Sequence, residues 1–168
     1  MSINKLSINI KKIYIEQAFE ILNFFKSIII EVHHIGSSKL AKIPYNCDMD
    51  ILFIVKSYDD VRNLADILIA EGYVHVNNFS DYFRDDMVMR KVVDGQNINM
   101  IFMSSASNKK NDILICTEHL LVNEQSCSDL KNLKRLLLKN EVTEAEYDER
   151  KYRLFQMIKD DGDHLTSV

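Results

Sequence analysis

The chain has 168 residues, of which 46% are hydrophobic and 27% are charged, and it contains no low-complexity tract. This composition is typical of one globular domain with a buried core, and it excludes disordered, collagen-like and linker proteins. The 21 basic and 25 acidic side chains give a net charge of −4. Because a negative bulk field repels the phosphate backbone, we expect no general binding to duplex nucleic acid.

The sequence carries no signal for export or for insertion into a membrane. Its first residues lack the basic stretch, apolar run and small-residue cleavage site of a signal peptide, and no segment approaches about 18 uncharged apolar residues. The cysteines, Cys47, Cys116 and Cys127, are odd in number and widely spaced, which favours reduced core thiols over a disulfide framework or a zinc site. We therefore expect a cytoplasmic protein with no membrane partner.

Apolar periodicity predicts an α/β (α+β) protein whose first two thirds form a sheet with helices. An amphipathic helix is expected up to about residue 25, followed by a strand ending near Ile35 and a second strand over 48–55. A helix over 58–71 comes next, with Ser57 at its start and Gly72 at its end. A weak strand near 74–76 precedes a hairpin of 87–93 with 97–103, joined by the turn Asp94-Gly95.

Beyond residue 111 the pattern is helical. Leu130 and Leu133 mark one helix, and Thr143 with Glu146 predicts a capping box that opens another. Asp86, just before the hairpin, is expected to be a turn or cap residue. We predict a single domain over residues 1–168, with the mixed sheet and its helices in 1–110 and a helical part in 111–160.

The segment between the first two strands carries the residues that suggest chemistry. Gly36 ends the first apolar strand, and neither helix capping nor a hairpin explains a glycine there. A loop with two lysines follows, and the next strand opens with Asp48 and Asp50. Because side chains alternate along a strand, these two carboxylates face the same side of the sheet. Such a pair is tolerated when a divalent cation lies between the two charges.

Paired hard oxygen ligands suit Mg²⁺, which completes its octahedron with water and substrate phosphate. A glycine lets a phosphate approach the backbone, serines donate hydroxyl and amide hydrogens, and Lys39 or another lysine of the loop neutralises charge. The sequence therefore predicts a site for a nucleoside triphosphate (NTP) with Mg²⁺ as cofactor. The predicted nucleotide-binding residues are Gly36, Ser37, Ser38 and Lys42, and the predicted catalytic and metal-binding residues are Asp48 and Asp50. The plainer alternative is a strand-ending turn beside a solvated carboxylate edge.

The order of these motifs resembles that of a known group of proteins. Gly36-Ser37, ten intervening residues and Asp48-Met49-Asp50 resemble the signature of the DNA-polymerase-β-like nucleotidyltransferase superfamily. More closely, His34-Ile35-Gly36-Ser37 is similar to the His-Ile-Gly-Ser-Thr start of the GrpB-like family. The similarity continues downstream over nearly the whole chain, through Phe83-Arg84, Leu133-Lys134-Arg135, Tyr147, Lys151 and Phe155. The resemblance implies a nucleotidyltransferase-like mixed β-sheet flanked by helices, with a helical C-terminal third, and it adds Arg84 to the nucleotide-binding residues.

The chain departs from the family pattern where catalysis is most sensitive. The superfamily spacing uses both Asp48 and Asp50, whereas an ungapped match to the GrpB-like family uses Asp50 alone. Many active superfamily members carry a third carboxylate on a later strand, and GrpB-like proteins tend to have His-x-His there. This chain has Asn97 and Asn99 at those positions. Because an amide takes no proton near neutral pH, they form a possible third-strand site that lacks an obvious general base.

Two hypotheses of different class follow. The first is an enzyme that transfers a nucleoside monophosphate from an NTP to an unknown small-molecule or macromolecular acceptor, with an antibiotic-modifying transferase as one variant. The second is a catalytically degenerate module that binds a nucleotide or a protein partner. Arg90, on the hairpin, is an alternative to Arg84 for contacting a triphosphate.

Overall fold

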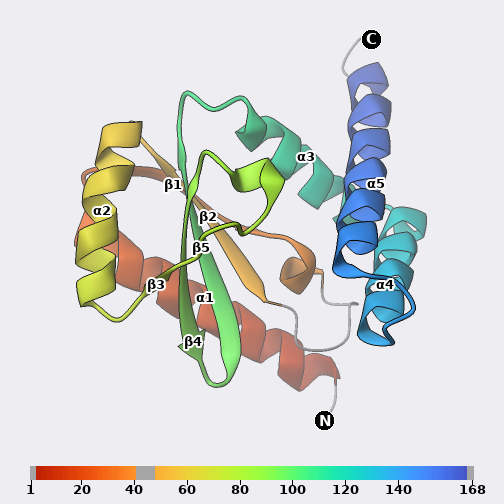
Figure 1. Ribbon diagram of the computed structural model, residues 1–168, viewed down its shortest axis with the longest axis horizontal. Helices are drawn as coiled ribbons and strands as arrows, with labels where there is room; N and C mark the ends of the chain where they lie inside the picture. The colour runs from red at the N-terminus through yellow and green to blue at the C-terminus, as the bar shows by residue number, and fades with distance from the viewer. Residues whose placement is uncertain (1–2, 41–47, 166–168) are drawn as a thin grey trace. The chain divides into compact units, whose positions relative to one another are not determined.

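A five-stranded mixed sheet lies at the centre of the N-terminal part of the computed structural model, which describes residues 3–40 and 48–165 (Figure 1). Its strand order is β1-β2-β5-β4-β3; β2 and β5 run parallel, and the other neighbours are antiparallel. The strands are β1 (Ile29–Ile35), β2 (Met49–Val55), β3 (Val74–His75), β4 (Met87–Val93) and β5 (Gln96–Ser104). The short 3-10 helix η1 (Ser37–Lys39) follows β1, and η2 (Asp81–Phe83) precedes β4. A mixed sheet with helices confirms the predicted fold class.

One face of the sheet forms a core with α1 (Ile3–Phe25) and α2 (Tyr58–Ala70). Alternate residues of β2 are buried on this face: Met49, Ile51, Phe53 and Val55. Leu52 and Ile54, which point to the opposite face, are fully buried as well. A central strand with apolar residues on both faces is therefore interrupted at Asp50, which is only half-buried.

The local signals in the sequence act where they were expected. Ser57 begins α2, and its Oγ accepts a hydrogen bond from the Asp60 backbone N–H at 3.2 Å. Gly72 follows the helix with a φ of 87°. Asp94 and Gly95, with φ values of 51° and 78°, join β4 to β5 in the left-handed conformation that a tight hairpin requires. The predicted helix cap and hairpin are thus confirmed.

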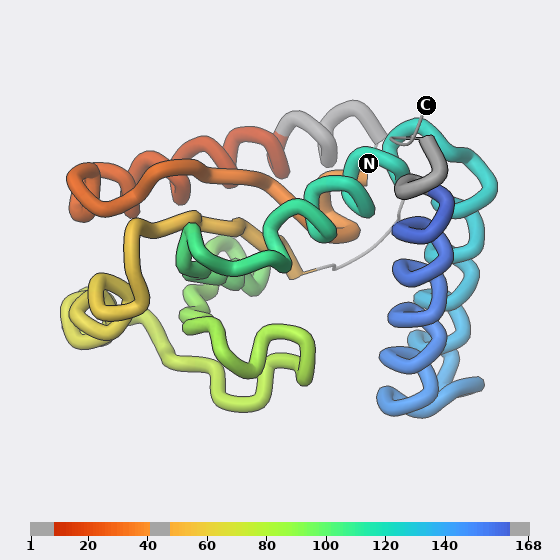
Figure 2. The backbone as a smooth tube through the Cα atoms, turned by 90° about the horizontal axis from the view of Figure 1, so that it is seen from above, coloured from red at the N-terminus to blue at the C-terminus, as the bar shows by residue number. Residues whose placement is uncertain are grey.

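The structure divides into two compact units, Met1–Lys110 and Asn111–Val168. The second contains most of α3 (Lys109–Val122), and all of α4 (Glu124–Leu138) and α5 (Glu144–Leu165). α4 and α5 lie side by side (Figure 2). Before α5, the Thr143 backbone N–H donates to Glu146 and the Glu146 backbone N–H donates to Thr143, which confirms the capping box. Within the described part of the chain, no helix is long and apolar enough to cross a membrane.

Two of the cysteines belong to the second unit. Cys116 of α3 is buried and Cys127 of α4 is half-buried, whereas Cys47 lies outside the described residues. Burial raises the pKa of the Cys116 thiol to about 11, so this thiol stays protonated and unreactive near neutral pH.

Candidate functional site

The predicted carboxylates lie at the start of β2, on the face of the sheet opposite α1 and α2. Cross-strand register places Asp50 beside Ile35 of β1 on one side and beside Asn99 of β5 on the other. Asn99 in turn lies opposite Arg90 of β4. Asp48 precedes Asp50 by two residues and therefore shares its face. Parallel pairing of β5 with β2 thus brings Asn99 to the carboxylates, and the hairpin through Asp94-Gly95 brings Arg90 to Asn99.

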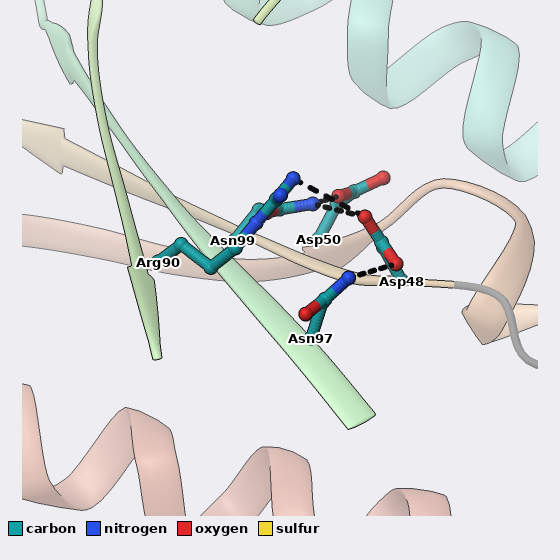
Figure 3. A network of polar contacts seen from close by, with 5 residues as sticks. All are labelled: Asp48, Asp50, Arg90, Asn97 and Asn99. Carbon is teal, nitrogen blue, oxygen red and sulfur yellow. Dashed lines mark hydrogen bonds and ion pairs between the residues drawn. The ribbon is translucent and has the colours of Figure 1, made fainter. Parts of the chain in front are cut away.

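These side chains form one polar network, in which they point toward one another (Figure 3). The Asn99 amide Nδ2 donates to Asp50 Oδ1 at 2.8 Å and to Asp48 Oδ2 at 3.3 Å. The Asn97 amide Nδ2 donates to Asp48 Oδ1 at 3.0 Å. Arg90 donates from Nε to Asn99 Oδ1 at 2.7 Å and from Nη2 to Asp48 Oδ2 at 3.3 Å. Two carboxylates therefore converge on a single amide nitrogen, with one guanidinium beside them.

Arg90 sets both the charge and the orientation of the network. Its guanidinium neutralises part of the repulsion between Asp48 and Asp50. An arginine only donates hydrogen bonds, so its bond from Nε fixes the carbonyl oxygen of Asn99 toward Arg90 and the NH₂ group toward the carboxylates. Asn99 is almost fully buried, at 1% exposed, which restricts this amide further. In this arrangement Asn99 is a donor to the carboxylates and not a base.

Gly36 lies directly against the Asp50 carboxylate. Its φ of 71° lies in the region that favours glycine. A Cβ atom built at this position would lie 2.6 Å from Asp50 Oδ2, which is too short for any real contact. The glycine therefore allows the turn after β1 to approach the carboxylate closely, and this explains a residue that neither capping nor a hairpin accounts for.

The two serines that follow Gly36 differ in their placement. Ser37 begins η1 and is half-buried, whereas Ser38 is buried at 6% exposed. The Ser38 Oγ lies 2.9 Å from His34 Nε2, and the His34 ring stacks on Tyr14 of α1 with centroids 4.9 Å apart. Burial, aided by Lys39, lowers the pKa of His34 to about 4, so the imidazole is neutral at pH 7. The Ser38 hydroxyl thus ties the loop to the core.

Two further predicted nucleotide-binding residues are not brought to this network by the structure. Lys42 lies outside the described residues. Arg84 lies at the end of η2 and pairs with Asp81 at 2.9 Å, with both side chains exposed to solvent. Arg90 contacts the Asp48 carboxylate instead. The register of a two-residue hairpin at Asp94-Gly95, which pairs residues 90 and 99, is the sequence signal that could have singled it out.

The donor set fits a hard divalent cation bound together with substrate. Both carboxylates reach one point, where the Asn99 nitrogen lies, and Mg²⁺ is commonly held by one or two carboxylates with the remaining ligands from water and phosphate. Among the described residues, no group of three or more His, Cys, Asp and Glu side chains is placed to hold a metal ion. A cation at Asp48 and Asp50 would therefore depend on oxygen atoms from other ligands.

Comparison with models of protein families gives a match for this chain. A family model described as GrpB protein matches residues 2–161. The chain belongs to the GrpB family. This result confirms the family resemblance read from the motifs, and it covers both units of the structure.

A solved structure has a similar fold. The crystal structure of the conserved protein GrpB from Enterococcus faecalis is similar with a TM-score of 0.73 and 17% sequence identity, over 90% of this chain and 91% of that chain. At this identity the likeness shows that this GrpB-family chain shares the fold. A search of curated proteins gave no match.

Proposed function

We propose that the sheet unit of this GrpB-family chain is a Mg²⁺-dependent nucleotidyltransferase that moves a nucleoside monophosphate from an NTP to an acceptor. The convergence of Asp48 and Asp50 on one amide nitrogen, beside the turn at Gly36, carries the proposal. The order of Gly-Ser and Asp-x-Asp on adjacent strands, which resembles the DNA-polymerase-β-like superfamily, supports it.

Each residue of the network has a role in this proposal. Asp48 and Asp50 hold the cation, and Mg²⁺ there would offset their repulsion and polarise the α-phosphate. Gly36 leaves room for a phosphate beside Asp50, and Ser37 is placed in the same turn to donate to it. Arg90, the nearest guanidinium, supplies positive charge to the triphosphate. The acceptor is a small molecule or a macromolecule with a hydroxyl or phosphate group.

A second candidate function is favoured by the hydrogen bonds that the two carboxylates already accept. Asn97, Asn99 and Arg90 already satisfy them with hydrogen bonds and partial charge neutralisation. A site of this kind binds a nucleotide without turning it over if no group removes the proton of the acceptor. The second candidate is therefore a nucleotide-binding module that lacks transfer activity.

The test is binding and turnover with each of the four NTPs. We expect calorimetry to show that Mg²⁺ and NTP bind more tightly together than either does alone, because the cation bridges the carboxylates and the phosphates. The synergy should disappear in the double variant Asp48→Asn/Asp50→Asn and persist in Asp59→Asn/Asp66→Asn, which makes the same charge change on the exposed face of α2. Pyrophosphate release then separates the enzyme from the binding module. Equal synergy in both double variants would contradict the site.

A further inference from the structure

The proposed transfer needs a group that accepts a proton, and the third-strand position does not provide one. A hydroxyl acceptor must lose its proton to attack phosphorus, and general-base help is typically worth about 10²- to 10⁴-fold in rate. Asn99 pairs with Asp50 across the two strands. An amide takes no proton near neutral pH, and the Asn99 NH₂ group already donates to both carboxylates. The base must therefore come from elsewhere on this face.

Strand alternation limits the choice to a few side chains. The face of the sheet that carries Asp50 is here called the site face. Among the described residues, β1, β2, β4, β5 and the residue before β2 place these ionisable side chains on it: Glu31, His33, Asp48, Asp50 and Arg90. The two aspartates are assigned to the cation, and an arginine is not deprotonated in proteins. Glu31 is held by two partners, as described next. His33 is the remaining group, and a histidine is suited to proton transfer near neutral pH.

Glu31 holds the His33 ring in a defined state. The His33 Nε2 lies 2.8 Å from Glu31 Oε2, and the Lys110 ammonium at the start of α3 donates to Glu31 Oε1 at 2.8 Å. Hydrogen bonds from Lys110 and His33 lower the pKa of the Glu31 carboxyl, so it is ionised and only accepts. Nε2 of His33 must therefore carry the hydrogen, which leaves the lone pair of the neutral ring on Nδ1.

His33 is also placed near the carboxylates. It pairs with Leu52, and its strand neighbour Ile35 pairs with Asp50, so His33 and Asp50 are diagonal neighbours on one face of antiparallel strands. Diagonal neighbours of this kind are about 7–8 Å apart, with their Cβ atoms somewhat closer, which leaves room for an acceptor hydroxyl between the two side chains. Among the described residues, the charged or titratable groups on this part of the face are Glu31 on β1, Lys110 on α3, Asp48 just before β2 and Asp50 on β2. His33 is half-buried, so a substrate can reach it.

We propose that His33, oriented by Glu31, is the general base of this site for a hydroxyl acceptor. The inference rests on the proposed function, because it assigns the proton acceptor of that same transfer. The acceptor oxygen forms a bond to the α-phosphorus, and its proton passes to His33 Nδ1. The bond from the α-phosphorus to the bridging oxygen of the β-phosphate breaks, and its electron pair leaves with pyrophosphate.

The test compares two acceptors in the variant His33→Gln, whose amide still donates to Glu31. Pyrophosphate release from Mg·ATP is measured with water as a hydroxyl acceptor and with inorganic phosphate, which is already ionised at pH 7. We expect the rate with water to fall about 10²- to 10⁴-fold, because the base is lost. The rate with phosphate and the affinity for Mg·ATP should stay at wild-type values. His75→Gln, on the exposed strand β3, is the matched control and should change neither rate.

A second measurement does not depend on turnover. The ¹⁵N chemical shifts of the His33 ring should report hydrogen on Nε2 in the wild type and a mixture of tautomers in Glu31→Ala. Wild-type turnover with an unaltered water rate in His33→Gln would overturn the inference and leave the proposed function standing. Hydrogen on Nδ1 in the wild type would overturn it as well. Absence of pyrophosphate release from the wild type with either acceptor would reject the proposed transferase and, with it, the role of His33.

Discussion

Arg90 is the positive charge beside the Asp48 and Asp50 carboxylates in the absence of a bound cation. Its guanidinium lies 3.3 Å from Asp48 Oδ2, and both side chains are about one third exposed. The Coulomb attraction at such a site is well above that of a fully solvated pair. A metal ion at Asp48 and Asp50 competes with this internal charge, so Arg90 should weaken the binding of Mg²⁺ alone.

The variant Arg90→Met tests this competition. Removing the guanidinium leaves the carboxylates without their counterion, so we expect Mg²⁺ to bind about tenfold more tightly, a gain of about 1.4 kcal/mol. Calorimetric titration with Mg²⁺ alone measures it. Arg84→Met removes the same charge at an exposed position paired with Asp81 and should leave the affinity unchanged. An equal affinity in Arg90→Met and the wild type would show that Arg90 is not a counterion of the cation site.

How far residues could be predicted from sequence depends on whether their role is local. Gly36 was singled out because no cap or turn explained it, and its conformation and its distance from Asp50 supply the reason. Arg84 was predicted in preference to Arg90 because it belongs to a family motif. Such a motif does not show which side chain strand pairing brings to the site. Glu31 and His33 lie two residues apart on one strand, so alternation could have paired them as it paired the two aspartates. Their position beside Asp50 could not be predicted, because it depends on the alignment of β1 with β2.

At the scale of elements, strand alternation and the turn signals predicted most of the sheet unit. The paired aspartates, the helix cap at Ser57 and the Asp94-Gly95 turn are all local patterns, and the structure has them where they were expected. The burial of both faces of β2 is not local, because it depends on which elements cover each face. The sequence also gives no sign of ion pairs between distant segments.

One such pair joins the segment before β4 to the start of α3. Asp86 lies in a turn, as predicted, but its side chain is fully buried and bonded to the Lys109 ammonium. That ammonium also donates to the Tyr82 carbonyl oxygen at 3.0 Å and lies 5.6 Å from the centre of the Tyr82 ring. Burial raises the pKa of Asp86, even though Lys109 opposes the shift. The Lys109 charge therefore compensates part of the cost of burying the Asp86 carboxylate.

Lysines at adjacent positions provide a matched test of this pair. Lys109→Met leaves Asp86 buried without a counterion, and we expect a loss of about 3 kcal/mol in the free energy of unfolding. Lys110→Met breaks a pair with Glu31 in which both side chains are about one third exposed, and it should cost at most about 1 kcal/mol. Urea denaturation of both variants measures the difference. Equal losses would mean that Asp86 is stabilised by its other surroundings.

At the scale of the whole molecule, the sheet unit combines a polar site on one face with a neutral histidine on the other. His34 pairs with Ile51, a core residue, whereas His33 beside it pairs with Leu52 on the site face. Adjacent histidines on one strand therefore have opposite surroundings. His34 is stacked on Tyr14 and half-buried, and burial disfavours the charged imidazolium. Protonation of His34 therefore lowers the stability of the fold.

This arrangement predicts that mild acid destabilises the sheet unit. The pKa of His34 is about 4 in the folded protein against an ordinary value of 6.5, chiefly because of burial. Between these values the unfolded chain binds more protons than the folded one, so the free energy of unfolding falls as the pH decreases below 6.5. The loss between pH 7 and pH 5 should reach up to about 2 kcal/mol, as follows from about 1.4 kcal/mol per pKa unit. The lowered pKa values of Glu20 and Glu31 add losses in the same direction only at lower pH.

Urea denaturation at pH 7 and pH 5, followed through the methyl NMR signals of Ile51 and Ile101, reports on the sheet unit separately from the helical one. His34→Gln loses the stacking on Tyr14 and should be less stable than the wild type at pH 7. It cannot take up the proton, however, so its stability should change much less between the two pH values. The two proteins should therefore approach each other in stability at pH 5. If the variant showed the same loss in acid as the wild type, the acid sensitivity would have to come from other groups, and His34 would not be the residue through which pH acts on this fold.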